Sequence, residues 1–542
     1  MHARRACLTW KDPLLSATTA PPSGEQQLSH RAILEVMVGL LAALFTAILA
    51  STIVSNALPT IIGELNGTQS QYTWVVTAAL LAMTVSTPVW SKLADLLNKK
   101  VLVQIAIVTF VVGSTIAGFA QNVETLLAAR AIQGLAMGGL TALTQAIIGS
   151  IVTPRERGRY SGYLGGTMAV ATVSGPLVGG IIVDTDWLGW RWTFFVCVPF
   201  AVVSLVLLQR YLRIETLKRD VKVDYAGAIL VAIAASLPLL WVTFAGDTYA
   251  WLSWQTAAFW AGTAIAVAAL IRVETRVDEP LVPLKVFRDR TTTLAIVASM
   301  AVGIAMFGSS VFLGQYLQVA QGHTPTEAGL LMIPLMGGSL VGTLVSGQLI
   351  TRYGRWKRFL VAGSVLLISG LLVLGTIDHD TSQIVIDTGM AAVGLGMGMM
   401  LQNLVLAVQN TVDVTEIGVT SGAVAFFRSL GGTIGVSVLG AILATGVQDR
   451  IASGLAKLGV DPGAAASAGG TLDFDAMPAP IATLVRTSYG DATAEIFAIA
   501  AGVAVVALIA VLLIKEVPLR TTIRKQEPAE LAEEGQPEPS TV

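Results

Sequence analysis

Two arginines lie inside otherwise uncharged stretches of the sequence, Arg130 within residues 126–151 and Arg428 within 420–445. A charge at the centre of a membrane helix costs roughly 2.5–3.5 kcal/mol on insertion scales, so each arginine should face protein or water. A cation at position 130 could alternately hold and release a carboxylate or carbonyl oxygen; the simpler alternative is that it snorkels or braces the first span. Small and polar residues share its helical face at three- and four-residue spacing: Gln133, Gly134, Met137, Gly138 and Thr141.

The residue types that catalysis and metal binding need are scattered. The two cysteines, Cys7 and Cys197, stand far apart, and the four histidines form no metal-ligand spacing. The sequence contains no Ser/His/Asp cluster, no phosphate-binding glycine–lysine loop and no basic stripe for nucleic acid. We therefore expect no enzyme activity, no metal, no cofactor and no nucleic-acid partner.

The composition excludes a soluble enzyme. Of the 542 residues 54% are hydrophobic and 13% are charged, whereas soluble domains carry about 25% charged residues. Mean hydropathy is +0.71, and the apolar residues form runs near the ~20 residues that cross a bilayer. The sequence predicts an all-α polytopic membrane protein with about fourteen spans, near 33–58, 72–90, 101–119, 126–151, 160–183, 192–212, 226–244, 254–271, 293–319, 329–350, 359–377, 384–408, 420–445 and 492–514.

Basic residues set the topology. Clusters of Lys and Arg follow the even-numbered spans, for example Lys99 and Lys100 after the second and Arg355 and Lys357 after the tenth. The positive-inside rule places these loops in the cytoplasm. We therefore expect a bacterial inner-membrane protein with both termini inside, a cytoplasmic tail over 1–32, a long external loop over 446–490 and a disordered acidic tail over 515–542.

An internal repeat divides the chain. Residues 91–100 and 347–355 both place a small residue, an aliphatic residue, a polar turn and then basic residues at the end of a span. Transporters built from repeated halves bind substrate between the halves, near the bilayer midplane. The predicted domains are a six-helix bundle over 33–214, an inserted helix pair over 215–290 and a second six-helix bundle over 291–514.

Four motifs resemble the fourteen-helix drug:proton antiporter branch of the major facilitator superfamily. They are the loop with Leu93, Asp95, Lys99 and Lys100, the string 130–134 (Arg-Ala-Ile-Gln-Gly), the glycines from Gly166 to Gly180 around Pro176, and the string 190–195 (Trp-Arg-Trp-Thr-Phe-Phe) with Pro199. The resemblance implies a major facilitator fold of two six-helix bundles. One position departs from the pattern, because Ala50 stands where the branch usually has an aspartate before Thr-Ile-Val.

The resemblance also assigns roles. Arg130 would take part in proton coupling. Asp95 would hold the cytoplasmic side shut, and the simpler alternative is that it is a solvated loop acid. Gly175 with Pro176 would let the fifth span bend and pack closely, and the simpler alternative is ordinary helix packing. With Ala50 unable to titrate, Glu35 and Glu495 are the carboxylates expected near span ends. Candidate cavity residues are Thr52, Ser55, Asn56, Gln133, Met137, Phe307, Met397, Gln402, Asn403, Phe426 and Arg428.

These residues favour a secondary transporter that works by alternating access. We expect it to export amphipathic small molecules such as drugs, antibiotics and dyes in exchange for protons, as a monomer in the lipid bilayer. A dedicated exporter of a lipid, a siderophore or a self-made antibiotic, neutral or anionic, is the second hypothesis. A non-transporting membrane sensor is the third, although the sequence contains no soluble sensory domain.

Overall fold

The computed structural model describes residues 30–151, 157–185, 187–212, 225–244, 249, 252–277, 287–412, 417–457 and 479–518. The described helices are α1 (His30–Glu64), α2 (Gln69–Leu96), α3 (Lys99–Gly118), α4 (Val123–Ile151), α5 (Arg157–Val183), α6 (Trp192–Phe195), α7 (Cys197–Tyr211), α8 (Tyr225–Phe244), α9 (Trp254–Glu274), α10 (Arg290–Val319), α11 (Pro325–Leu331), α12 (Ile333–Tyr353), α13 (Lys357–Leu374), α14 (Gln383–Thr411), α15 (Ile417–Lys457) and α17 (Ala479–Leu513). The predicted all-α fold is confirmed over these residues. The predicted tail 1–32 and the tail 515–542 lie almost entirely outside them.

The number of membrane spans matches the prediction in part. Twelve helices in the described part of the chain are long and apolar enough to cross a membrane. α5 and α8 add shorter apolar stretches, Val170–Val183 and Ala226–Trp241. The count of fourteen spans therefore stays a prediction.

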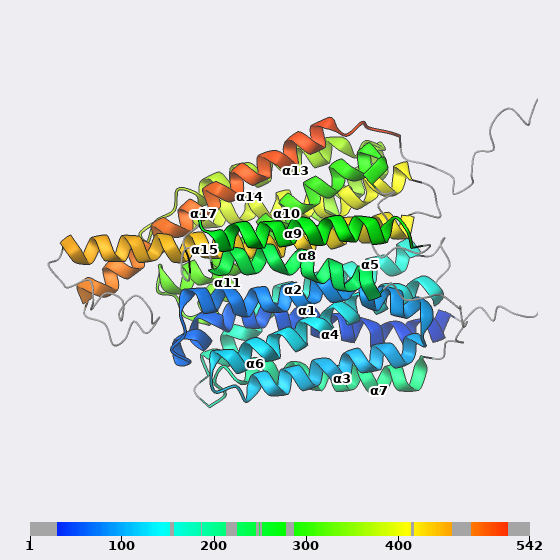
Figure 1. The fold of residues 1–542 in the computed structure, drawn as a ribbon, viewed down its shortest axis with the longest axis horizontal. Helices are drawn as coiled ribbons and strands as arrows, with labels where there is room; N and C mark the ends of the chain where they lie inside the picture. The colour runs from blue at the N-terminus through cyan, green and yellow to red at the C-terminus, as the bar shows by residue number, and fades with distance from the viewer. Residues whose placement is uncertain are drawn as a thin grey trace, which may run out of the picture.

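The helices form two bundles with a helix pair beside them (Figure 1). α1 to α7 pack together as a first half, and α10 to α17 as a second. α8 and α9 pack on each other, and α8 also contacts α2 of the first half and α15 of the second. The inserted pair thus lies along one side of the junction between the halves.

Local sequence signals set several helix ends. Thr68 and Gln71 form a reciprocal capping box at the start of α2, and Thr324 and Glu327 form another at α11. Two predicted spans are interrupted: α6 gives way to α7 at Val196, and α11 to α12 at Met332. In both cases a proline follows within three residues, at Pro199 and Pro334, and proline cannot donate the backbone hydrogen bond that a continuous helix needs.

The predicted external loop 446–490 is helical at both ends. α15 continues to Lys457 and α17 already begins at Ala479, so α15 is about 61 Å long, against a hydrocarbon core of about 30 Å. Val447, Ile451 and Leu455 recur every fourth residue and are buried in the apolar core. This spacing extends the helical pairing of α15 with α17 beyond the predicted span ends.

The apolar core is continuous between the halves at one end only. Near the α1–α2 turn, Val54 and Leu58 of α1 and Val75 of α2 belong to the same buried cluster as Val311 of α10. Toward the other end, the buried cluster of the first half contains residues of that half alone, such as Met37 and Leu140. We call the end with the α1–α2 turn the closed end, and the opposite end, which carries Lys99, Lys100, Arg355 and Lys357, the basic end.

Candidate transport pathway and gate

A pair of glutamines joins the two halves at the closed end. The side-chain amide of Gln315 (α10) donates to Oε1 of Gln69 (α2) at 2.6 Å, and that of Gln69 donates to Oε1 of Gln315 at 3.2 Å. The Tyr489 hydroxyl of α17 also donates to Gln69 Oε1, at 3.1 Å. All three side chains are buried. Because each acceptor is satisfied and none of the groups is charged, this contact can be buried at little cost.

Asn56 of α1 forms a second junction. Its side-chain amide donates to the carbonyl oxygens of Pro176 in α5 and Pro325 at the start of α11, both at 2.9 Å. Its backbone carbonyl oxygen accepts a hydrogen bond from Gln318 of α10 at 2.8 Å. The predicted cavity residue Asn56 is therefore buried in the closure between the halves.

Glycines let α5 and α11 approach closely across the same junction. A Cβ atom at Gly180 would lie 2.4 Å from the Cα of Thr326, and one at Gly329 would lie 2.5 Å from the carbonyl oxygen of Pro176. The backbone N–H of Thr326 donates to the Asp184 carboxylate at 2.9 Å. Only glycine fits at 180 and 329 without moving backbone.

Gly175 has a different neighbour from these two. A Cβ there would lie 1.9 Å from Oγ1 of Thr52, which is on α1 of the same half. Thr52 in turn donates toward the carbonyl oxygens of Ile48 and Leu49. Gly175 and Thr52 thus fasten α5 to α1 within the first half.

Hydroxyl pairs continue the junction along α2 and α15. The Thr77 and Ser437 hydroxyls lie 3.1 Å apart, and those of Thr84 and Thr433 lie 3.4 Å apart. Thr84 is about 22 Å along α2, near its midpoint. We call all these contacts between the halves, from Gln69–Gln315 to Thr84–Thr433, the seam.

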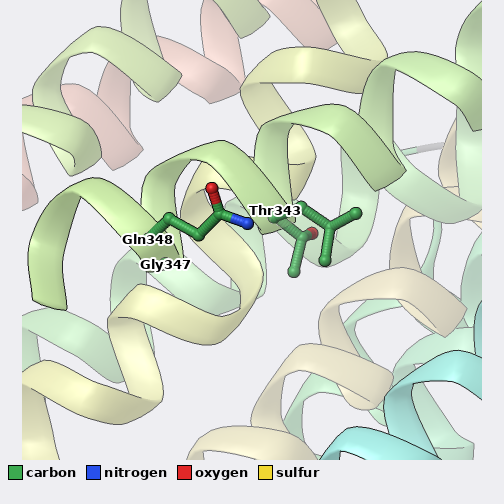
Figure 2. Close-up of a pocket in the computed structure, with 4 residues that line it drawn as sticks. Thr343, Gly347 and Gln348 are labelled. Carbon is green, nitrogen blue, oxygen red and sulfur yellow. The ribbon is translucent and has the colours of Figure 1, made fainter.

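Residues toward the basic end have open space beside them. A Cβ at Gly347 of α12 or Gly422 of α15 would meet nothing within 4 Å. Thr343, Leu344, Gly347 and Gln348 line a hollow of about 440 Å³ beside α12 (Figure 2). Because the seam and the shared apolar core both lie toward the closed end, the described contacts that join the halves are concentrated there.

Arg130 is buried inside the first half and its exposed fraction is 2%. Its Nη1 donates to Oε1 of Gln133 at 3.0 Å and its Nε to the carbonyl oxygen of Val75 in α2 at 3.4 Å. The side-chain amide of Gln133 in turn donates a hydrogen bond to the Ser114 hydroxyl of α3 at 2.8 Å. Both of these partners of the guanidinium are neutral, and among the described residues no ion pair neutralises it.

The carboxylates do not follow the prediction that only Glu35 and Glu495 lie near span ends. Glu64 at the end of α1 accepts a hydrogen bond from Nε1 of Trp190 at 2.8 Å, Glu274 is buried in the last turn of α9, and Asp387 lies in the first turns of α14. Glu495 forms an ion pair with Arg450 at 2.8 Å. Glu64 and Glu274 lie beyond the predicted span ends at 58 and 271 because α1 and α9 extend further, whereas Asp387 already stands inside the predicted span 384–408.

One carboxylate outside the spans has a perturbed pKa. The hydroxyl of Thr381 donates to the Asp378 carboxylate at 2.7 Å and holds the pKa of that carboxyl below its usual range. The carbonyl oxygen of Asp378 accepts from the Tyr316 hydroxyl at 2.6 Å. This loop between α13 and α14 therefore caps the closed-end tip of α10.

The other predicted site residues lie in different places. Glu35 is half-buried near the start of α1, and Asp95 lies in the last turn of α2, with its side chain outside the described residues. Ser55 donates to the Ser51 carbonyl oxygen within α1, while Met137 and Met397 are buried. Asn403 donates to Ser346 of α12 at 3.0 Å, and Gln402 is exposed. Phe307, Phe426 and Arg428 are half-buried around α10 and α15.

The seam residues Gln69, Gln315 and Tyr489 were not predicted. The sequence does contain a signal for the α10 side of the seam. Glutamines recur there every third residue near the end of an apolar run, at Gln315, Gln318 and Gln321. Two of these amides, Gln315 and Gln318, lie on the membrane helix itself and need partners. The partners on α2 and α17, however, are far from Gln315 in the chain, 246 residues in the case of Gln69, and show no local pattern.

The sequence profile of the Major Facilitator Superfamily matches residues 40–436. The chain belongs to this superfamily. It is 34% identical over 421 residues to the multidrug transporter protein MdtP of Bacillus subtilis, covering 78% of this chain and 77% of that protein. It is 34% identical over 506 residues to an uncharacterised MFS-type transporter of Mycobacterium tuberculosis, covering 93% and 72%, and 30% identical over 498 residues to the efflux pump dotC of Dothistroma septosporum, covering 90% and 85%.

Solved structures share the superfamily's fold. A bacterial homologue of the human lysosomal transporter Spinster, inward-facing and occupied, matches with a TM-score of 0.61 at 14% identity, over 90% of this chain and 97% of that one. The nucleoside transporter NupG matches with a TM-score of 0.55 at 12% identity, over 88% and 98%. The predicted family and fold are confirmed, and this protein is a multi-pass membrane transporter rather than an enzyme.

Proposed function

We propose that this superfamily member exports amphipathic small molecules in exchange for protons. The basic end faces the cytoplasm in this proposal, as the positive-inside rule predicts. The conformation would then be open to the cytoplasm, where substrate enters, and closed toward the outside. Several relatives carry the names of multidrug transporters or efflux pumps, which supports the direction of transport.

The seam is the observation that carries this proposal. Apart from the hydrogen bond from the Thr326 N–H to the Asp184 carboxylate, it consists of neutral hydrogen bonds and glycine contacts, and a neutral hydrogen bond contributes only about 0.5–1.5 kcal/mol net. Two states of a transporter must differ by only a few kcal/mol if both are to be populated. A closure of this kind can separate and hydrate in each cycle, as alternating access requires.

Arg130 is the proposed coupling residue. It is bound in this conformation by the Val75 carbonyl oxygen and by Gln133, both of which can be exchanged for other partners when α2 and α4 shift. In the proposal, a carboxylate elsewhere in the chain takes up a proton, and this protonation changes whether the Val75 carbonyl oxygen and Gln133 stay bound to Arg130. The energy source is the proton gradient, with no bound cofactor.

Dye accumulation in cells tests the transport activity directly. We expect cells that contain the protein to accumulate less of at least one amphipathic dye, either ethidium or an anionic dye, than cells without it. A protonophore should abolish the difference, because it removes the proton gradient. A difference that persists with the protonophore would contradict proton coupling, and no difference for either dye would contradict multidrug export.

A second candidate function is dedicated export of a neutral or anionic metabolite such as a lipid, a siderophore or a self-made antibiotic. The observation that favours it is Ala50, which is buried in α1 where related antiporters usually have an aspartate. Export of one endogenous compound with no response to either dye would distinguish this function.

A further inference from the structure

Arg428 lies on the face of α15 that packs against α10. A Cβ atom at Gly303 of α10 would lie 2.1 Å from the carbonyl oxygen of Arg428 and 3.1 Å from the backbone nitrogen of Gly432. Gly432, one turn further along the same face, is in turn packed against the ring of Phe307. Arg428 is therefore on the side of α15 that faces the interior of the second half.

The guanidinium of Arg428 has no acceptor in the described part of the protein. The structure gives it no hydrogen bond and no ion pair with any described residue, and its side chain is only partly covered. A guanidinium has five N–H donors in a fixed fork, so this one presents unused donors to whatever enters beside it. Arg130, by contrast, is fully buried and has two acceptors.

Aromatic side chains lie on the turn of α15 before Arg428 and on α10 beside Gly432. Phe426 and Phe427 lie edge to face with centroids 5.2 Å apart, and Phe287 packs on Phe427 at 5.6 Å. Phe307 lies one helical turn away beside Gly432. Of these rings, Phe307 packs against the face of α15 that carries Arg428 and Gly432, so an aromatic or aliphatic body that packs on Phe307 can direct a polar head toward the guanidinium.

Three described carboxylates of the second half have partners of their own. Glu495 is paired with Arg450, which is 22 residues further along α15 and thus about 33 Å away. Asp289 caps the start of α10, where it accepts hydrogen bonds from the first turn of that helix, about 21 Å before Gly303. Asp387 lies in the first turns of α14, toward the closed end. Because charges interact strongly where water is scarce, the positive charge of the guanidinium itself attracts anions and repels lipophilic cations.

We infer that Arg428 binds the head group of the transported molecule and that the preferred substrates are amphipathic oxyanions. The head is a carboxylate, sulfonate or phosphate, which a guanidinium can bind through two parallel hydrogen bonds. The inference rests on the proposed export function and narrows its substrate class. It reverses the charge preference that a drug exporter with an aspartate in the first span would have.

Binding to the purified full-length protein tests the inference. Equilibrium dialysis compares two aromatic probes of opposite charge, anilinonaphthalene sulfonate and ethidium, for the natural protein and for R428Q and R428K. R272Q is the matched control, since Arg272 is exposed at the end of α9 and its change removes the same charge. Size-exclusion profiles and thermal unfolding establish that each variant is folded.

We expect the natural protein and R272Q to bind the sulfonate more tightly than ethidium. R428Q should lose at least tenfold in sulfonate affinity, R428K should retain part of it, and ethidium affinity should stay equal or rise. Unchanged sulfonate binding by R428Q would overturn the inference, and so would tighter binding of ethidium or no binding of either probe by the natural protein.

Transport separates this inference from the proposed function. Protonophore-sensitive export of ethidium that R428Q does not impair would leave proton-driven efflux standing and would overturn the anion preference. Absence of any protonophore-sensitive export, together with Arg428-dependent sulfonate binding, would instead contradict the export function and leave the anion site intact.

Discussion

At the scale of single residues, burial and partners separate the two membrane arginines. Arg130 is enclosed by α2, α3 and α4 and is held by a carbonyl and an amide oxygen. Arg428 is partly exposed and has no partner among the described residues. An enclosed cation responds to movements of its helices, whereas an open cation responds to a ligand, so the first suits coupling and the second suits recognition.

Replacement of Arg130 should therefore abolish coupling and leave the fold in place. For Arg130→Ala we expect at least a tenfold loss of protonophore-sensitive dye export, and for Arg130→Lys a smaller loss, because lysine keeps the charge but cannot bridge Val75 and Gln133 with a fork. Export rates in cells and size-exclusion profiles of the purified variants measure both effects.

Arg210 supplies the control, because it is exposed in the last turn of α7. Arg210→Ala should export at the rate of the natural protein. Full activity of Arg130→Ala would eliminate the coupling role and leave Arg130 as a brace within the first half.

At the scale of elements, the glycines of α5 divide by the helix that they contact. Gly175 contacts Thr52 of α1 inside the first half, whereas Gly180 contacts Thr326 of α11 in the second half. A bulkier residue at 175 would strain a contact that both transport states keep, since each half moves as a unit. A bulkier residue at 180 would strain only the state in which the closed end is shut.

Gly180→Val should consequently shift the protein toward the state that is open at the closed end. Overpacking of this kind costs about 1–3 kcal/mol, which is enough to change the ratio of two states severalfold. Reaction of a cysteine introduced at the buried position Gln69 with a water-soluble maleimide, in a Cys7→Ser background, measures the shift.

Gly502→Val is the matched substitution for this measurement. Gly502 lies on α17, and a Cβ there would meet nothing within 4 Å, so its maleimide reaction should equal that of the parent. Equal reaction rates in Gly180→Val and Gly502→Val would contradict a role for the α5–α11 contact in closure.

At the scale of the whole molecule, the seam and the inserted pair define how the halves can move. α8 contacts both α2 and α15, so it lies beside the part of the seam that these two helices form. Opening the closed end requires that Thr77 and Ser437, now 3.1 Å apart, separate. A covalent bond at this place should stop the cycle.

We expect the double variant T77C/S437C to lose export when it is oxidised and to regain it in dithiothreitol. The hydroxyl oxygens are already close enough for small side-chain adjustments to bring two sulfur atoms to the roughly 2 Å of a disulfide. Export before and after reduction, in a Cys7→Ser background with each single variant as control, measures the effect. Undiminished export by the oxidised double variant would show that the closed end does not open in transport.

The local sequence was sufficient for the membrane, the helices and the superfamily. Helical runs of about 20 apolar residues and the capping box at Thr68 depend on neighbours within a few positions, and the motif around Arg130 is contiguous. Helix ends were predicted less well, because the extensions of α15 and α17 are stabilised by contacts between residues such as Gly454 and Leu484, which the sequence alone does not pair.

Only the tertiary structure decided which end of the molecule is closed, what holds Arg130 and that Arg428 is left without a partner among the described residues. Gln69 meets Gln315 across 246 residues of chain, and Thr77 meets Ser437 across 360. Such pairings follow from how two preformed halves dock, and the same sequence must also permit them to separate. Composition and periodicity depend on the environment of each single helix, so the sequence determines which helices form each half. The docking of the halves determines where a substrate can enter.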